Sequence, residues 1–411
     1  MSSRNRILLA VLLAFGCHDL VLMSFPTMFD FVSAELGTSH TQEGLLMSVV
    51  FIAAILLGIP LGRRMDRADL RRYGFWGLVV MLPGIWMCSV SSYPAMLLGR
   101  FLVGVGGIVL NLVGAAAIGR HFQGKKLGTA MGIFQAVFPA TAMVDYLFVR
   151  AVAEGAGWRS VVLGTAGIAV ACVLLFPLLW SEDRGAAAGS YGMAAGSGYP
   201  APEVSASAAG GDRARMVFIL LCVEWFLFCF AGGQVTTFGS AFIGETSADA
   251  SFGDGALALL MLGVLPGSPL AGRLLDRVRD RSHVLVGSAV LAVLLGLLFM
   301  LRIGPPHAVL FLMGMLQSGI PVGTYALVAE VSPRLKVATW FGILLTASNL
   351  GSVLGPALSG WLKDVTGSHL PGMAAMCGIS VLMLAACVLV LAIRRSAPTP
   401  GSEVAEQARA E

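Results

Sequence analysis

The chain has 411 residues, of which 57% are hydrophobic and only 12% are charged, and its formal net charge at pH 7 is +4. A soluble protein of this length would carry about a quarter charged residues, so the composition excludes an ordinary soluble globular protein. The mean hydropathy of +0.83 instead predicts an integral membrane protein.

Apolar runs follow one another along the whole chain, each about 20 residues long, which is the length of a helix that crosses a bilayer. They are predicted to be helices because an unpaired backbone group in lipid costs several kcal/mol, and strand-like alternation is absent. The first run carries His18 and Asp19 and has no small-residue cleavage site, so we interpret it as a retained span. The twelve predicted spans are 7–29, 44–62, 73–91, 94–118, 127–149, 159–180, 215–237, 255–275, 283–302, 306–329, 337–361 and 371–393.

The basic residues are distributed unevenly between the two sides of the predicted membrane. If both termini are cytoplasmic, all but five of the 27 Lys and Arg residues fall in cytoplasmic segments. The exceptions are Arg100 inside a span and Arg150, Arg159, Arg302 and Lys363 on the other side. This asymmetry predicts a plasma-membrane (cell inner membrane) protein with cytoplasmic termini. The positive charge then belongs to the cytoplasmic face, so no nucleic-acid partner is expected.

The chain carries no signature of a cofactor or metal site. All seven cysteines fall in predicted spans without metal-type spacing, so we expect buried free thiols. HExxH, GxSxG and phosphate-loop motifs are absent, which disfavours an enzyme and a primary, ATP-driven transporter. We therefore expect no cofactor and no metal.

The chain divides into two similar halves. Residues 181–214 are rich in Gly, Ala, Ser and Pro, which predicts a flexible cytoplasmic linker between a bundle of six helices over 1–180 and another over 215–395. Residues 396–411 are predicted to be a disordered cytoplasmic tail. One constant offset of 210 residues superimposes Gly62, Arg63, Asp66, Arg67 and Arg71 on Gly272, Arg273, Asp276, Arg277 and Arg281, and Thr129, Gly132 and Ile133 on Thr339, Gly342 and Ile343. This register indicates an internal duplication, the architecture of one large class of secondary transporters.

Several motifs resemble those of the major facilitator superfamily. The sequences GRRMDR from Gly62 and GRLLDR from Gly272 each follow the second span of a half and are similar to the family's G-x-x-x-D-R loop. The stretch RFLVGVG from Arg100 and the tripeptide Gly157-Trp158-Arg159 are also similar to family patterns, whereas residues 68–70 depart from the loop motif. The resemblance covers nearly the whole chain. It implies an all-α polytopic fold of twelve transmembrane helices in two pseudo-symmetric six-helix bundles, and secondary active transport by alternating access.

The two charged loops are predicted to form a gate at the cytoplasmic surface. Gly62 should let helices approach closely, and Asp66 should accept hydrogen bonds from Arg67 or Arg71 that break in another state. An acid is not needed to set topology, so the repeated acid–Arg pairs favour gating over a purely topological role. The predicted gating residues are Gly62, Asp66, Arg67, Arg71, Gly272, Asp276, Arg277 and Arg281.

Ionisable residues inside spans are costly and therefore mark candidate coupling sites. They are His18, Asp19, Arg100, Asp145 and Glu224. Arg100 and Asp145 lie at similar depth in antiparallel spans, so a pair between them is geometrically open, either for coupling or as a permanent structural ion pair. His18 and Asp19 point about 100° apart on a helix and are not expected to pair with each other.

Uncharged residues complete the predicted site. Six polar side chains are candidates for lining a cavity, although about half of such residues only bond a neighbouring helix: Asn111, Gln135, Gln234, Gln317, Tyr325 and Asn349. Five residues are expected to serve helix packing and kinking: Gly104, Gly106, Gly351, Gly355 and Pro356.

These features predict a monomeric, proton-coupled secondary transporter of a small molecule in the lipid bilayer, with an organic anion or a small drug-like compound as substrate. Uptake and efflux, and symport and antiport, stay open. The alternatives are a transporter fold that acts as a sensor or assembly scaffold and, less favoured, a polytopic membrane enzyme. Uptake into proteoliposomes under an imposed pH gradient separates them, because a scaffold or an enzyme would move nothing.

Overall fold

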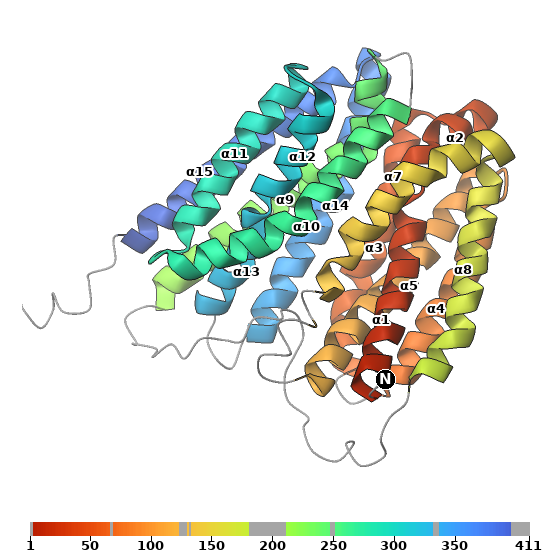
Figure 1. Ribbon diagram of the computed structural model, residues 1–411, viewed down its shortest axis with the longest axis horizontal. Coiled ribbons are helices and arrows are strands. Elements are labelled where there is room, and N and C mark those ends of the chain that lie inside the picture. Colours follow the sequence, from red (N-terminus) through yellow and green to blue (C-terminus); the bar gives the residue numbers. More distant parts are fainter. Residues whose placement is uncertain are drawn as a thin grey trace, which may run out of the picture.

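The computed structural model describes residues 3–65, 69–122, 130, 133–180, 211–246, 251–331 and 337–395, and these residues form helices and no strands (Figure 1). The helices of the first half are α1 (Ser3–Met23), the short 3-10 helix η1 (Pro26–Met28), α2 (Phe29–Leu36), α3 (His40–Met65), α4 (Leu70–Cys88), α5 (Tyr93–His121), α7 (Val137–Ala156) and α8 (Trp158–Leu179). The second half contains α9 (Gly211–Gly244), α10 (Ser251–Arg277), α11 (Ser282–Met300), α12 (Pro306–Gln317), α13 (Gly319–Val331), α14 (Val337–Thr366) and α15 (Leu370–Arg395).

Eleven segments of the described chain are long and apolar enough to cross a membrane. Two of them are interrupted: α1, η1 and α2 together form Ser3–Leu36, and α12 and α13 together form Pro306–Val331. The predicted span that is not among these eleven is 73–91, which corresponds to α4. The first turn of α4 contains Arg71 and Arg72, which lower its mean hydropathy. It packs along α5 and α8 like its neighbours.

The helices form two bundles that lie side by side, α1 to α8 in red to yellow and α9 to α15 in green to blue (Figure 1). Glycines set the closest approaches within each bundle, because a Cβ at these positions would collide with a neighbouring backbone. A Cβ on Gly104 of α5 would lie 2.2 Å from the carbonyl oxygen of Val50 in α3, and one on Gly355 of α14 would lie 2.2 Å from that of Phe230 in α9. Gly106 packs against the side chain of Met81 and the carbonyl of Gly77. Gly351 packs against the carbonyl of Phe226.

The bundles touch through α3 with α14 and through α7 with α10. The contact is tightest where α3 begins: a Cβ on Gly44 would lie 2.4 Å from the carbonyl oxygen of Pro356, and one on Gly360 would lie 2.1 Å from that of His40. Ser48 also donates a hydrogen bond to the carbonyl of Val353. We call this the closed end of the molecule, and the opposite end, at which α1 begins, the open end.

The predicted tail, 396–411, lies entirely outside the described residues. Of the predicted linker, 181–210 also lie outside them, and only 211–214 are described. α9 begins at Gly211, four residues earlier than the second half was expected to start. Asp66 and Arg67 of the first charged loop, and Thr129 and Gly132 of the repeated segment, also lie outside the described residues.

Candidate substrate cavity and buried ionisable residues

A cavity of about 1410 Å³ lies between the two bundles. It extends from Pro356, next to the contacts of the closed end, to Gly62 and Gly272 at the open end. Its walls are mostly aliphatic side chains, methionines and phenylalanines. Among the described residues that line it, none carries a charge.

The polar lining is dominated by four carboxamides. Asn111 on α5, Gln135 just before α7, Gln317 at the end of α12 and Asn349 on α14 all line the cavity. The two bundles thus contribute two carboxamides each, and none of the four makes a hydrogen bond to another described residue. Their hydrogen-bond donors and acceptors therefore remain available to a molecule in the cavity.

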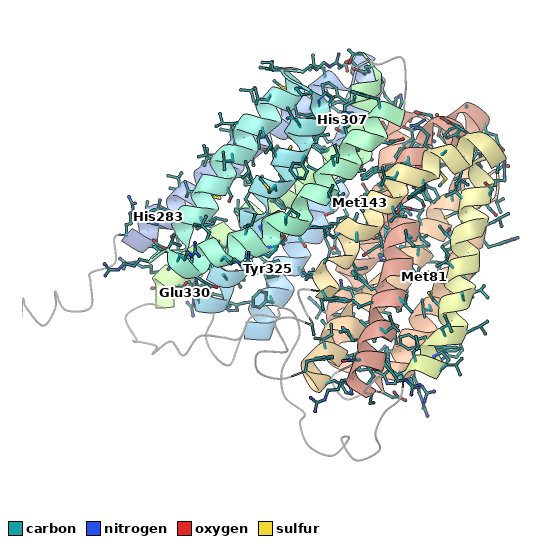
Figure 2. The ribbon with its side chains drawn as sticks, in the orientation of Figure 1. Met81, Met143, His283, His307, Tyr325 and Glu330 are labelled. Atoms are coloured by element: carbon teal, nitrogen blue, oxygen red, sulfur yellow. The ribbon has the colours of Figure 1, made fainter. Side chains whose placement is uncertain are left out.

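The two other predicted lining residues behave differently. Tyr325 of α13 lines the cavity, its ring stacked on Phe341 at 5.7 Å and edge-on to Trp225 at 5.4 Å. Figure 2 shows Tyr325 between the α10 and α14 ribbons. Gln234 does not line the cavity, which corrects the prediction: it is fully buried in α9, and its amide has no partner among the described residues.

His18 and Asp19 form a hydrogen bond, contrary to the expectation that they would not pair. His18 Nδ1 lies 3.1 Å from Asp19 Oδ1, and both side chains are buried. The 100° separation holds for the Cα–Cβ bonds, but an imidazole and a carboxylate extend far enough to bend toward each other. The ring stacks on Phe15 and lies against Gly107, where a Cβ would be 2.0 Å from Nε2, and no described residue bonds Nε2 or Asp19 Oδ2.

The pair between Arg100 and Asp145, which the sequence left open, is not formed in this structure. Its side chain is fully buried and donates to backbone carbonyls, from Nε to Leu46 at 3.0 Å, from Nη1 to Val21 at 2.9 Å and from Nη2 to Leu22 at 3.3 Å. Val21 and Leu22 belong to the last turn of α1, where carbonyls lack helical partners and the helix dipole favours a cation. Arg100 therefore caps α1 and ties it to α3 and α5.

Asp145 and Glu224 are buried carboxyl groups that lack a basic partner among the described residues. Asp145 is 3% exposed, and its Oδ2 has no hydrogen-bond partner in the described chain. Glu224 of α9 is fully buried, with Oε2 accepting from Thr324 at 2.8 Å and Oε1 unpartnered. Neither side chain lines the cavity, but Phe228, one helical turn after Glu224, does.

Among the gating residues that the structure describes, the predicted contacts at the open end are not made. A Cβ on Gly62 or Gly272 would meet nothing within 4 Å, so the expected close approach is not made, because these helix ends border the cavity. Asp276 and Arg277 are exposed and form no ion pair within the described chain. Their neighbours are engaged: Arg281 lies 3.7 Å from Glu330, and Arg71 donates to the carbonyl of Pro177 at 2.8 Å. Figure 2 places Glu330 at this end.

From the sequence we did not predict a set of ion pairs that lies at the closed end. The four basic residues that broke the positive-inside pattern all form ion pairs there: Arg150 with Asp254 and Asp30, Arg159 with Glu35, and Arg302 and Lys363 with Glu245. Their exceptional position was the sequence signal that could have found them, because a basic residue on the wrong side needs a local reason.

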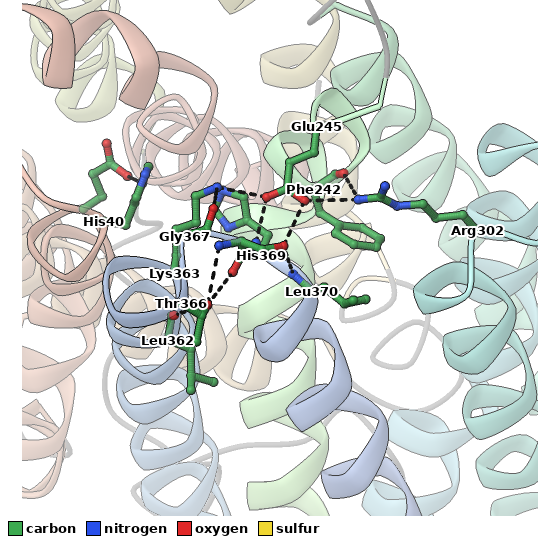
Figure 3. A network of polar contacts seen from close by, with 12 residues as sticks. His40, Phe242, Glu245, Arg302, Leu362, Lys363, Thr366, Gly367, His369 and Leu370 are labelled. Atoms are coloured by element: carbon green, nitrogen blue, oxygen red, sulfur yellow. Dashed lines mark hydrogen bonds and ion pairs between the residues drawn. The ribbon is translucent and has the colours of Figure 1, made fainter.

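Figure 3 shows the network around Glu245, which collects contacts from three segments of the second bundle. Lys363 Nζ and the backbone N–H of His369 donate to Oε1 at 2.9 and 2.7 Å, and Arg302 donates to Oε2 at 3.1 Å. Desolvation opposes ionisation, but the hydrogen bonds from His369 and Lys363 and the charge of Lys363 hold the pKa of Glu245 below its ordinary value. Burial and the charge of Lys363 lower the pKa of His369 to about 4, so this ring is neutral at pH 7.

Contacts between the bundles complete the closed end. His40 and Thr41 of α3 donate from their backbone N–H groups to Asp364 of α14 at 2.9 and 2.7 Å. The rings of His40 and His369 meet edge-on with centroids 5.4 Å apart. Tyr146 of α7 donates to the carbonyl of Thr236 in α9 at 2.7 Å. These contacts join bundles that are separated by the cavity toward the open end.

Comparison with known proteins agrees with this architecture. Solved structures with similar folds include a bacterial homologue of the human lysosomal transporter Spinster in an inward-facing, occupied conformation (TM-score 0.70, 18% identity, 96% of each chain). Another is a mutant of the nucleoside transporter NupG (TM-score 0.72, 15% identity, 95% of this chain and 100% of the other).

Relatives in sequence are also named as transporters. A protein of Agrobacterium vitis named as a tartrate transporter is 24% identical over 91% of this chain and 89% of its own. The match to a protein of Staphylococcus epidermidis named as the nitrate transporter NarT is 28% identical over 33% of this chain, and the match to the nitrite extrusion protein of Bacillus subtilis is 24% identical over 35%. The chain spans about a third of the length of these two relatives. The model of the family described as "Major Facilitator Superfamily" matches residues 8–301 and 225–411. This chain therefore belongs to the major facilitator superfamily of membrane transporters.

Proposed function

We propose that this protein is a proton-coupled secondary transporter that moves a small, uncharged organic molecule across the membrane by alternating access. The single observation that supports this proposal most is the cavity, in which four unpartnered carboxamides lie in an apolar wall. Ligand sites of transporters and enzymes typically combine such an apolar lining with a few well-placed polar groups.

The charge of the lining favours a neutral drug-like compound over an organic or inorganic anion. An anion taken from water into an apolar cavity needs a cation or several donors to offset desolvation. No cationic side chain lines the cavity among the described residues, and the guanidinium of Arg100, which is not part of the lining, is occupied by backbone carbonyls. Nitrate, nitrite and tartrate, the anions in the relatives' names, are therefore disfavoured as substrates of this chain.

Proton coupling is proposed to reside in the buried carboxyl groups beside the cavity. Asp19 with its partner His18, and Asp145, lie in the first bundle, and Glu224 lies in the second. Each of the three carboxyl groups keeps an oxygen without a partner in the described chain. A buried carboxyl group that lacks a counter-charge favours a bound proton, so Asp145 and Glu224 are each suited to carry one, and Asp19 can share one with His18. Arg100 serves in this scheme as a structural cap.

The proposed orientation of the protein in the membrane follows from the distribution of its basic residues. With both termini in the cytoplasm, the open end would face inward and the closed end outward, and we assign the structure to an inward-open state on that basis. The protein would act as a monomer in a plasma membrane, since one chain supplies both bundles and the whole cavity.

Uptake into proteoliposomes under an imposed pH gradient tests the proposal. The panel contains neutral compounds that carry amide or hydroxyl groups, together with nitrate, nitrite and tartrate. We expect gradient-dependent accumulation of neutral compounds and none of the three anions. Accumulation of an anion, or of no compound at all, would contradict the proposal.

A matched pair of variants connects uptake to the cavity. Asn349→Leu removes a carboxamide of the lining at similar volume, and we expect it to weaken uptake of a neutral substrate about tenfold through KM, the effect of one or two lost hydrogen bonds. Leu350→Ala alters the next residue, which is 45% exposed outside the cavity, and should leave KM unchanged.

A further inference from the structure

Arg150 of α7 contacts two carboxylates at the closed end. Its Nε donates to Oδ2 of Asp254 in α10, and its Nη2 donates to Oδ2 of Asp30 in α2 at 3.2 Å. The guanidinium also lies over the ring of Phe31, 5.7 Å from its centroid. One cation is thus shared between two acids from different parts of the molecule.

The two carboxylates differ in bundle and in exposure. Asp254 belongs to the second bundle, its side chain is 2% exposed, and it also accepts a hydrogen bond from Ser240 of α9. Asp30 belongs to the same bundle as Arg150, and its side chain is 63% exposed. Only the bond to Asp254 therefore crosses the interface between the bundles.

Opening the closed end has to separate α7 from α10, because these helices contact each other across the interface. The bond between Arg150 and Asp254 must then break. A partly buried ion pair that loses one partner is normally costly, since an uncompensated charge is left behind. Here each charged group keeps a partner in its own bundle, Arg150 keeping Asp30 and Asp254 keeping Ser240.

We propose that Arg150 sets the balance between the two end states of transport by passing from Asp254 in the closed state to Asp30 alone when the closed end opens. This inference rests on the proposed alternating access but not on the proposed substrate or on proton coupling. It makes Arg150 a positioning residue for the conformational step, with Asp30 as the acceptor that stabilises the open state.

The proposal predicts opposite effects for the two acids. Asp254→Asn removes a contact that exists only while the closed end is shut. The ratio of molecules whose closed end is shut to molecules in which it has opened should therefore fall about tenfold, within the usual range of conformational coupling. Asp30→Asn removes the remaining carboxylate partner of Arg150 in the open state, so the same ratio should rise about threefold. A purely structural cluster would be loosened by both changes.

Distances between spin labels measure this ratio without a substrate. The labels are placed on cysteines introduced for Glu154 of α7 and for Ile303 of the second bundle, both exposed near the closed end, after replacement of the seven native cysteines. Asp212→Asn, an exposed acid at the open end, is the matched control and should change nothing.

Asp30→Asn is decisive, because an exposed side chain is replaced and the variant is expected to fold. A rise of the closed fraction in this variant, with a fall in Asp254→Asn, supports the transfer. An unchanged or lower closed fraction in Asp30→Asn, or an unchanged fraction in Asp254→Asn, overturns it. If the proposed neutral substrate or proton coupling is wrong, these populations still follow the prediction, so the two failures are distinguishable.

Discussion

Replacing Arg100 by Met should destabilise the protein independently of Asp145. The guanidinium donates three hydrogen bonds to carbonyls of Leu46, Val21 and Leu22. Hydrogen bonds from a charged donor contribute about 1.5–3 kcal/mol each in soluble proteins, whereas side-chain bonds in membranes average nearer 0.6 kcal/mol. Three bonds at the membrane average contribute about 2 kcal/mol, and three at the lower value for soluble proteins contribute about 4.5 kcal/mol, so we predict a loss of about 2–5 kcal/mol in the free energy of unfolding.

A double-mutant cycle separates this account from a buried ion pair. Asp145→Asn should change stability by less than ~1 kcal/mol, because no basic group in the described chain pairs with it, and the coupling between the two sites should stay below ~0.5 kcal/mol. The assay is SDS-induced unfolding in mixed micelles, followed by tryptophan fluorescence. A coupling above ~2 kcal/mol, with Asp145→Asn strongly destabilising alone and rescued by Arg100→Met, would refute the capping role.

Three further variants test separate features. Gly355→Val should cost about 1–3 kcal/mol of unfolding free energy, because its Cβ would lie 2.2 Å from the Phe230 carbonyl, and an unchanged melting temperature would disprove the tight α9–α14 contact. Glu224→Gln should keep the hydrogen bond with Thr324 yet reduce proton-driven uptake about tenfold, and wild-type uptake would remove Glu224 from the coupling scheme. Glu245 has a pKa below its ordinary 4.5, so its ionised form adds stability above that value and loses it as the pH falls through the lowered pKa. The melting temperature of Glu245→Gln should therefore lie below wild type at pH 7 and converge with it in acid, and a constant difference at all pH values would contradict this.

The sequence was sufficient to predict the fold. Twelve apolar runs, the constant offset from Gly62 to Gly272 and the resemblance of the two loops identify a duplicated bundle of the major facilitator superfamily, and the family match agrees. Five of the six predicted polar lining residues border the cavity, because polar groups inside spans are costly unless they face water or a partner. Gln234 is the exception, buried in α9.

The partners of the buried charges could not be predicted. Arg100 binds carbonyls that become available only because α1 ends at Met23 before Pro26, and a pattern of side chains does not show which backbone groups lack partners. The hydrogen bond between His18 and Asp19 depends on side-chain torsions, which helical periodicity does not fix. The gating contacts depend on the conformational state. In this state the two bundles are apart at the open end, whereas the ion pair between Arg150 and Asp254 joins them at the closed end.

The most direct test of the account measures protons and substrate together. A pH-sensitive dye inside proteoliposomes reports proton movement while a transported neutral compound is added without an imposed gradient. We predict proton flux at a fixed ratio to substrate flux, and loss of that proton flux in the variant Asp145→Asn with Glu224→Gln, in which two of the proposed proton carriers are removed. Substrate movement without any proton movement in the wild-type protein would contradict the account.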